Sequence, residues 1–197
     1  RGALANQAMA FSRKGEFEKA VQNFNTYITL NPTRPAGYIG RGTVRAKQKQ
    51  YEAALADFSK AIEMNPEAAE GYLNRANVEM NLSRTQEAMN DLDEAQRLNP
   101  FAAEVYANRG RLSLQMGHLG DAERDLDQAI KLNPKLATGL TNRALFYAAT
   151  DKLDAAKADL DRVISMNPRD AHAFFNRGNV YVGLRQTAQA LADYDKA

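Results

Sequence analysis

Small and large apolar residues recur along the chain at a fixed interval of 34 residues. Each 34-residue unit is numbered here so that the proline of a recurring Asn-Pro pair is position 32. Position 8 is then always alanine or glycine, and position 24 is always large and apolar. Position 20 is alanine in all six units: Ala20, Ala54, Ala88, Ala122, Ala156 and Ala190. Positions 4, 8 and 11, and likewise 20, 24 and 27, are spaced as on one face of an α-helix, so each unit predicts two helices.

Turn-forming residues predict where these helices begin and end. Proline disfavours helical geometry in the residue before it, so the asparagine of each Asn-Pro pair should end the second helix. Gly15, Ser83, Gly117 and Asp151, near position 15, suit a short turn between the two helices. First helices are expected at about 2–14, 36–48, 70–82, 104–116, 138–150 and 172–184. Second helices are expected at about 18–30, 52–64, 86–98, 120–132, 154–166 and 188–197.

The fixed period predicts a repeat solenoid, in which each unit buries its apolar face on its neighbours. Small residues at positions 8 and 20 allow two helices to cross closely, because larger side chains would hold the backbones apart. We therefore expect one all-α domain over residues 1–197. Its six repeats are 1–34, 35–68, 69–102, 103–136, 137–170 and 171–197, the last of them truncated.

These columns resemble the tetratricopeptide repeat, whose pattern has a bulky position 4, a small position 8, alanine at 20, a large apolar residue at 24 and proline at 32. The resemblance covers the whole chain. It implies a right-handed α-α superhelix of antiparallel helix pairs with a concave groove. One departure is clear: position 7, usually leucine in the family, is arginine in five repeats.

The arginines at position 7 are matched by acidic residues at position 23. Position 7 carries Arg41, Arg75, Arg109, Arg143 and Arg177, and position 23 of the same repeats carries Asp57, Asp91, Asp125, Asp159 and Asp193. The one repeat with neutral Gln7 has neutral Asn23. This match predicts ion pairs within each repeat that join its first helix to its second. A basic stripe for phosphates is the alternative, but the aspartates would cancel the charge of the arginines locally.

Asparagine recurs at position 6, next to each of these arginines except Arg41. The resemblance places positions 2, 5, 6, 9, 12 and 13 on the concave surface. An asparagine amide can both donate to and accept from a peptide bond. The candidate peptide-binding residues are Asn74, Asn77, Asn108, Arg111, Asn142, Asn176 and Asn179. The alternative is that the asparagines at position 6 tie neighbouring helices together through a backbone carbonyl.

The expected function is a non-catalytic scaffold or adaptor that binds an extended peptide or a partner helix in the concave groove. The subset of the family that grips chaperone carboxylates has lysine at position 5, and this chain has none there. The asparagine row is similar to that of the superhelical part of O-linked N-acetylglucosamine transferases. The alternatives are a substrate-recruiting arm of a larger, glycosyltransferase-like enzyme whose catalytic part is absent from this chain, and a self-assembly module.

Charge and the types of reactive side chain mainly exclude classes of partner and of site. With 26 basic and 24 acidic side chains the net charge is +2, which gives no electrostatic reason to expect nucleic acid or an anionic membrane surface as the partner. The uninterrupted apolar stretches are only a few residues long, so no direct insertion into a membrane is expected. The absence of cysteine fits a cytoplasmic and a periplasmic protein alike. His118 and His172 are predicted to lie far apart, and the acidic runs at 91–95 and 125–129 read as solvated helix faces. No catalytic residue, cofactor or metal site is therefore expected.

The sixth repeat stops at Ala197, before an Asn-Pro pair and without a polar closing helix. Solenoids usually cap their ends, so Phe175, Tyr181, Val182 and Tyr194 are expected to be partly exposed. Continuation of the natural chain is expected, with a homodimer through the uncapped repeat as the alternative. Because the chain starts at arginine rather than methionine, it also reads as a processed or excised piece.

Overall fold

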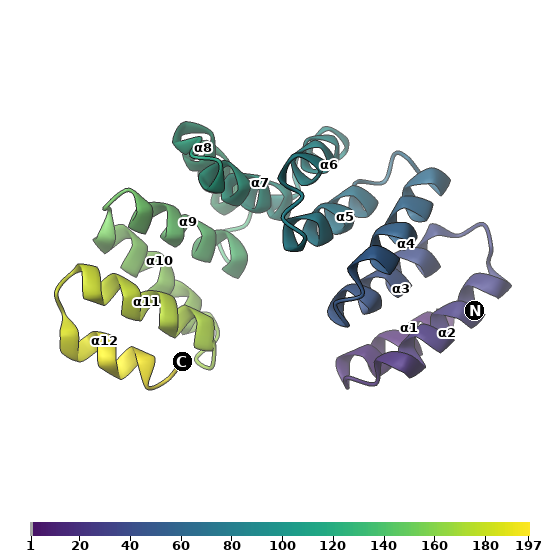
Figure 1. Cartoon of the computed structure of the whole chain (residues 1–197), viewed down its shortest axis with the longest axis horizontal. Helices are drawn as coiled ribbons and strands as arrows, with labels where there is room; N and C mark the ends of the chain where they lie inside the picture. The colour runs from purple at the N-terminus through teal and green to yellow at the C-terminus, as the bar shows by residue number, and fades with distance from the viewer. Residues whose placement is uncertain (1) are drawn as a thin grey trace. The chain divides into compact units, whose positions relative to one another are not determined.

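The computed structural model describes residues 2–197, which form twelve α-helices joined by short turns (Figure 1). They are α1 (Gly2–Arg13), α2 (Phe17–Leu30), α3 (Pro35–Lys47), α4 (Tyr51–Met64), α5 (Ala69–Asn81), α6 (Thr85–Leu98), α7 (Ala103–Gln115), α8 (Leu119–Leu132), α9 (Ala137–Ala149), α10 (Leu153–Met166), α11 (Ala171–Gly183) and α12 (Thr187–Tyr194). No β-strand occurs in this described range. The all-α prediction is therefore confirmed, with every expected helix in place.

Odd-numbered helices are the first, or A, helices of successive repeats, and even-numbered helices are the second, or B, helices. The B helices of the first five repeats end immediately before the asparagine of each Asn-Pro pair, as predicted: Asn31, Asn65, Asn99, Asn133 and Asn167. The last B helix, α12, ends at Tyr194, earlier than expected.

The helices form two compact units, with α1–α6 in the first and α7–α12 in the second. The division falls between Pro100 and Phe101, at the end of the third repeat. Within each unit, every A helix packs against the B helix that follows it, and B helices pack against the next A helix (Figure 1). This is the nearest-neighbour packing of a repeat solenoid.

The alternation of small and large apolar columns accounts for the core of each repeat. All six alanines of position 20 are buried, and so are the large residues of position 24 in the first five repeats. Position 8 lies against position 24 of the same repeat: a Cβ added to Gly42 would be 2.8 Å from Cε1 of Phe58. A and B helices therefore cross closely because position 8 stays small, as the sequence predicts.

An arginine–aspartate fork joins the A and B helices of each of the five repeats that contain position-7 arginine. In repeat 5, Nε of Arg143 donates to Oδ2 of Asp159 at 2.7 Å, and Nη2 donates to Oδ1 at 2.9 Å. The equivalent pairs are Arg41–Asp57, Arg75–Asp91, Arg109–Asp125 and Arg177–Asp193. The aspartates are buried, so these are desolvated, bidentate ion pairs. The predicted pairing within each repeat is confirmed.

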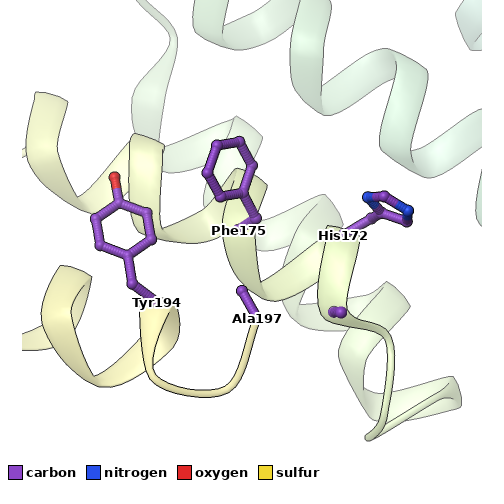
Figure 2. Close-up of a pocket in the computed structure, with 5 residues that line it drawn as sticks. His172, Phe175, Tyr194 and Ala197 are labelled. Carbon is purple, nitrogen blue, oxygen red and sulfur yellow. The ribbon is translucent and has the colours of Figure 1, made fainter.

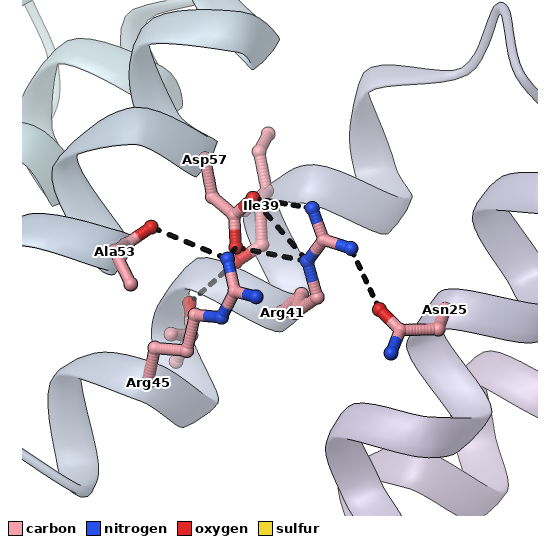
Figure 3. A network of polar contacts seen from close by, with 7 residues as sticks. Asn25, Ile39, Arg41, Arg45, Ala53 and Asp57 are labelled. Carbon is pink, nitrogen blue, oxygen red and sulfur yellow. Dashed lines mark hydrogen bonds and ion pairs between the residues drawn. The ribbon is translucent and has the colours of Figure 1, made fainter. Parts of the chain in front are cut away.

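The same guanidinium also reaches the preceding repeat, which the sequence analysis missed. Nη1 of Arg143 donates to Asp127 at 2.9 Å, and Nη1 of Arg177 donates to Asp161 at 2.6 Å. Figure 3 shows the corresponding contact of Arg41 with Asn25, at 2.6 Å. The acceptors all stand at position 25, on the B helix of the preceding repeat. One arginine side chain thus joins three helices and fixes the spacing of neighbouring repeats.

The acidic runs on the B helices are not solvated along their whole length. In the run at 125–129, Asp125 is only 2% exposed and binds Arg109. Interpreting the run as a solvated face was therefore wrong for its first aspartate. Position 23 faces the A helix of its own repeat, whereas position 25 faces the next repeat.

The turn between A and B helices adopts a left-handed backbone at position 15 in every repeat. The φ angles are 78° at Gly15, 60° at Lys49, 57° at Ser83, 77° at Gly117, 60° at Asp151 and 59° at Arg185. Glycine adopts this conformation at no steric cost, whereas a side chain with a Cβ is strained in it. Four of the six turns therefore carry strain.

Replacing Lys49 by glycine is expected to raise the free energy of unfolding by about 0.5–1 kcal/mol, because relief of strain exceeds the added entropy of the unfolded chain. Urea denaturation followed by circular dichroism measures the change. Lys47→Gly is the control: it lies in the last turn of α3 and should lower stability. A destabilised Lys49→Gly variant would contradict the account of the turn.

Replacing Arg143 by glutamine should lower the free energy of unfolding by about 3 kcal/mol, because the buried Asp159 carboxylate loses its bidentate partner and keeps only Arg162, 3.6 Å away. The double variant Arg143→Gln/Asp159→Asn, which copies the neutral Gln7 and Asn23 of repeat 1, should recover at least half of that loss. Denaturant titration of the wild type, both single variants and the double variant gives the coupling. Additive losses would show that the two side chains do not act as a pair.

Candidate functional site

Each unit carries a pocket between two successive A helices. In the first unit the pocket lies between α3 and α5 and has a volume of about 240 Å³; it is lined by Thr43, Ala46, Lys47, Phe58, Asn74, Asn77, Val78 and Asn81. In the second unit it lies between α9 and α11 and has a volume of about 190 Å³; it is lined by Ala144, Leu145, Ala148, Leu153, Leu160, Asn176, Asn179 and Val180. These are called the α3/α5 pocket and the α9/α11 pocket.

The two pockets are built from the same repeat positions. Both use positions 9, 12 and 24 of one repeat and positions 6, 9 and 10 of the next. Asparagine stands at positions 6 and 9, and valine at position 10, of the second repeat in each pair. The period of the sequence therefore produces the same arrangement in both units.

The pockets combine an apolar floor with asparagine amides. In the α3/α5 pocket the floor is Phe58 and Val78, which are both buried. The side chains of Asn74 and, in the other pocket, Asn176 are half-buried. Neither amide makes a side-chain hydrogen bond to any residue in the described range 2–197. A half-buried amide in this state keeps its donors and its acceptor available to water or to a ligand.

The asparagines at position 9 are partly engaged within the protein. Oδ1 of Asn179 accepts a hydrogen bond of 2.8 Å from the hydroxyl of Tyr194. The carbonyl of Asn77 accepts one of 2.8 Å from the side-chain amide of Asn81. Both asparagines remain exposed, so they form the rim of the pockets rather than the floor.

Asn142 has the structural role that the sequence analysis gave as the alternative. It is only 6% exposed, and its Nδ2 donates to the carbonyl of Ala107 at 3.0 Å. This bond ties α9 to α7, the A helix before it. Including Asn142 among the groove residues is therefore corrected: position 6 binds the neighbouring backbone in this repeat and faces a pocket in two others.

The remaining candidates, Asn108 and Arg111, lie half-buried on α7. Burial lowers the pKa of the Arg111 guanidinium. Neither residue lines the α3/α5 or the α9/α11 pocket. A peptide-binding role for them stays a prediction.

A further pocket of the first unit, between α1 and α3, shows what the asparagines add. It has a volume of about 230 Å³ and is lined by Ala5, Met9, Phe24, Ala36, Ile39, Gly40, Thr43 and Glu70. Position 6 is Gly40 here, so no amide is present. The asparagines could be found from the sequence pattern but the apolar floors could not, because position 24 contributes both to the core and to the pocket.

The described residues offer little for chemistry. His118 precedes α8 and His172 lies in the first turn of α11, and both are exposed. Within residues 2–197, no group of three potential metal ligands is gathered in one place. None of the helices in the described part of the chain is both long and apolar enough to cross a membrane.

Two protein-family models match the sequence. A tetratricopeptide-repeat model matches residues 5–69, 39–103 and 145–197, and a second model of the same description matches residues 103–136. The chain belongs to the tetratricopeptide-repeat family. Proteins of this family are generally non-catalytic scaffolds for protein–protein interaction. No curated protein sequence matches the chain.

Solved tetratricopeptide-repeat structures share the fold. A tetratricopeptide-repeat protein from Parabacteroides merdae is 25% identical, with 99% of this chain and 77% of that protein covered and a TM-score of 0.73. YrrB, described as having an unusual peptide-binding site, is 25% identical, with coverages of 88% and 89% and a TM-score of 0.60. A chain of the APC/C hetero-tetramer Cut9–Hcn1 is 17% identical, with 98% of this chain and 38% of that chain covered and a TM-score of 0.91.

A buried carboxylate, Glu79, lies on α5 next to a residue that lines the α3/α5 pocket. Glu79 follows the pocket residue Val78, and its Oε2 has no hydrogen-bond partner in the described range. Burial, together with the charge of Asp91, raises the pKa of Glu79 to about 7, although Arg75 opposes the shift. Nε of Arg75 is 3.9 Å from Oε1 of Glu79, too far for a strong pair.

The raised pKa predicts a stability that falls as the pH rises from about 4.5 to about 7, because the folded chain holds the Glu79 proton more tightly than the unfolded chain. Glu79→Gln should therefore raise the free energy of unfolding by about 1–3 kcal/mol at pH 8 and change it little at pH 4. Urea titrations at both pH values measure this. Glu67→Gln, at an exposed carboxylate, is the control. An equal gain at both pH values would exclude titration of Glu79 as the cause.

Proposed function

We propose that this chain is a non-catalytic scaffold that binds an extended peptide segment of a partner protein in its A-helix pockets. The observation that carries the proposal is the pair of equivalent pockets in which an asparagine without an internal partner, Asn74 or Asn176, stands over an apolar floor. The arrangement recurs in both units.

The chemistry of these pockets suits an extended backbone. Each asparagine amide can donate to a peptide carbonyl and accept from a peptide N–H, and an extended peptide leaves both groups unpaired. The floors, Phe58 with Val78 and Leu160 with Val180, suit an apolar side chain of that peptide. Volumes of about 240 and 190 Å³ fit single side chains rather than a folded ligand.

Few charged groups line the two pockets. Lys47 is the single charged residue among those that line the α3/α5 pocket, and the α9/α11 pocket is lined by neutral residues throughout. Hydrogen bonds and apolar contacts should therefore dominate affinity, and binding should depend only weakly on salt. Peptide binding in YrrB supports the same class of ligand for this chain.

The test selects ligands from a library of random linear peptides displayed on phage, using the full chain as bait. Selected peptides are expected to bind the wild type and to lose about tenfold in affinity with Asn74→Ala or Asn176→Ala, because a desolvated amide pair is removed. Fluorescence anisotropy gives the dissociation constants. Both variants should keep the stability of the wild type, since these amides make no internal hydrogen bond.

Two further asparagine-to-alanine variants serve as controls. Asn90 is exposed on α6 and its Oδ1 accepts from Gln86, so Asn90→Ala should leave binding unchanged. Asn142→Ala should lower stability, because it removes the bond to Ala107. Failure to select any linear peptide, or full affinity in the Asn74→Ala/Asn176→Ala double variant, would refute the proposal.

A further inference from the structure

The pocket between α1 and α3, the α1/α3 pocket, differs from the two asparagine pockets in its polar group. In the α3/α5 and α9/α11 pockets an asparagine at position 6 supplies that group, whereas position 6 is Gly40 here. The α1/α3 pocket is instead completed by Glu70, which comes from α5, one repeat further along the chain. A pocket that offers a carboxylate in place of an amide should select a different side chain.

The missing side chain at Gly40 shapes the wall of this pocket. A Cβ added to Gly40 would be 2.3 Å from Cε1 and Cζ of Phe24, so the ring occupies the space in which an asparagine side chain would begin. Phe24 is buried and packs in one cluster with Val44, and Met9 packs against that cluster. The wall is therefore apolar and belongs to the core, which cannot shift freely to admit an amide at position 6.

The carboxylate of Glu70 is available to a ligand. Glu70 is exposed in the first turn of α5, and it makes no hydrogen bond or ion pair with any residue in the described range 2–197. The hydroxyl of Thr43, which also lines the pocket, already donates to the carbonyl of Ile39 at 2.9 Å. Glu70 is thus the charged group that an incoming side chain would meet in this pocket.

The α1/α3 pocket also differs in charge from the other pockets described for residues 2–197. One of these, in the second unit, has a volume of about 540 Å³ and is lined by Ala171, His172, Phe175, Tyr194 and Ala197 (Figure 2). The α9/α11 pocket is lined by neutral residues, and the α3/α5 pocket adds a cation, Lys47. Glu70 is therefore the one acidic side chain among the residues that line these four pockets.

The α1/α3 pocket continues into the α3/α5 pocket, because Thr43 lines both. Glu70 and Asn74 lie four residues apart on α5, so they share one face of the helix, about 6 Å apart along its axis. Residues two positions apart in an extended peptide point to the same side and are about 6.5 Å apart. One extended peptide can therefore reach Asn74 with one residue and Glu70 with a residue two positions away.

We propose that the α1/α3 pocket selects a lysine or arginine of the bound peptide, two positions from the residue that Asn74 binds. The methylene stem of that side chain lies against Met9, Phe24 and Ile39. Its charged head pairs with Glu70, as long basic side chains allow. This inference rests on the peptide binding proposed above and specifies one residue of the peptide. Because Glu70 is exposed, the pair contributes to selectivity more than to affinity.

The test starts from a peptide selected on the full chain and places arginine, citrulline or glutamate at each of its positions in turn. Citrulline has nearly the shape of arginine but no charge. At one position, fluorescence anisotropy is expected to show arginine binding about three- to fivefold more tightly than citrulline and about tenfold more tightly than glutamate. In Glu70→Gln, arginine and citrulline should bind equally there, and Glu70→Lys should favour glutamate over arginine.

Glu104→Gln is the matched control. Glu104 stands at position 2 of its repeat, as Glu70 does, and is likewise exposed in the first turn of an A helix. It is not among the residues that line the four pockets. This variant should keep the arginine preference of the wild type. Since both glutamates are exposed, each glutamine variant should also keep the melting temperature of the wild type, which circular dichroism checks.

A second measurement needs no selected peptide. N-acetyl-arginine amide and the corresponding citrulline amide are titrated into the full chain, and the methyl signals of Met9 and Ile39 are followed by NMR. The arginine probe should shift these signals at a several-fold lower concentration than the citrulline probe, and Glu70→Gln should remove the difference. The methyl signals of Leu145, which lines the α9/α11 pocket, should respond to both probes alike.

The two measurements separate this proposal from that of peptide binding. A selected peptide whose affinity depends on Asn74 but prefers arginine at no position would overturn the Glu70 site alone. An arginine preference that persists in Glu70→Gln would also overturn it, because another group would then hold the cation. If no linear peptide is selected, the peptide proposal fails and the probes decide on the pocket. A difference between the probes that disappears in Glu70→Gln then supports the cation site, and equal responses refute it.

Discussion

The packing of helices within and between repeats depends on the ion pairs that the arginine at position 7 makes. Apolar packing between small and large residues brings helices together, but it tolerates small shifts along and around the helix axis. A bidentate pair has fixed geometry and is costly to leave half-made once its aspartate is buried. Because the third nitrogen of the same arginine binds the preceding B helix, one side chain sets both the angle within a repeat and the step to the repeat before it.

This arrangement explains why a charged residue replaces the apolar one usual at position 7 of the family. Five arginines stand there, and the ring of position 4 lies under the guanidinium in repeats such as the second, where Arg41 is 5.5 Å from the centroid of Tyr38. The ring covers the flat face of the arginine while its edge nitrogens are paired. The net charge of the chain is near neutral because its 26 basic and 24 acidic side chains nearly cancel.

The fold could be predicted from the sequence because the sequence repeats. Each repeat position occurs up to six times, so positions that are always apolar could be told apart from variable surface positions. The pairing of positions 7 and 23 was found through covariation between repeats, as in the matched change to Gln7 and Asn23. Position 25 was missed because its charge does not follow that of position 7: Arg41 is matched there by neutral Asn25, whereas Arg143 is matched by Asp127. The site was only partly readable. Whether a position-6 asparagine faces a pocket, as Asn176 does, or a neighbouring carbonyl, as Asn142 does, depends on small differences in helix spacing that the column does not encode.

The first repeat is the exception to the fork, and this has a consequence for how the solenoid opens. In the described range, the amide nitrogen of Asn23 is buried without a hydrogen-bond partner, and Gln7 is exposed. The α1 helix is therefore held without an arginine fork, through apolar packing and a contact of Lys19 with the Phe11 ring, whereas α2 also receives the hydrogen bond from Arg41 to Asn25. Backbone amides of α1 should exchange with solvent deuterium earlier than those of α3, because local opening of a solenoid begins where its neighbour contacts are weakest.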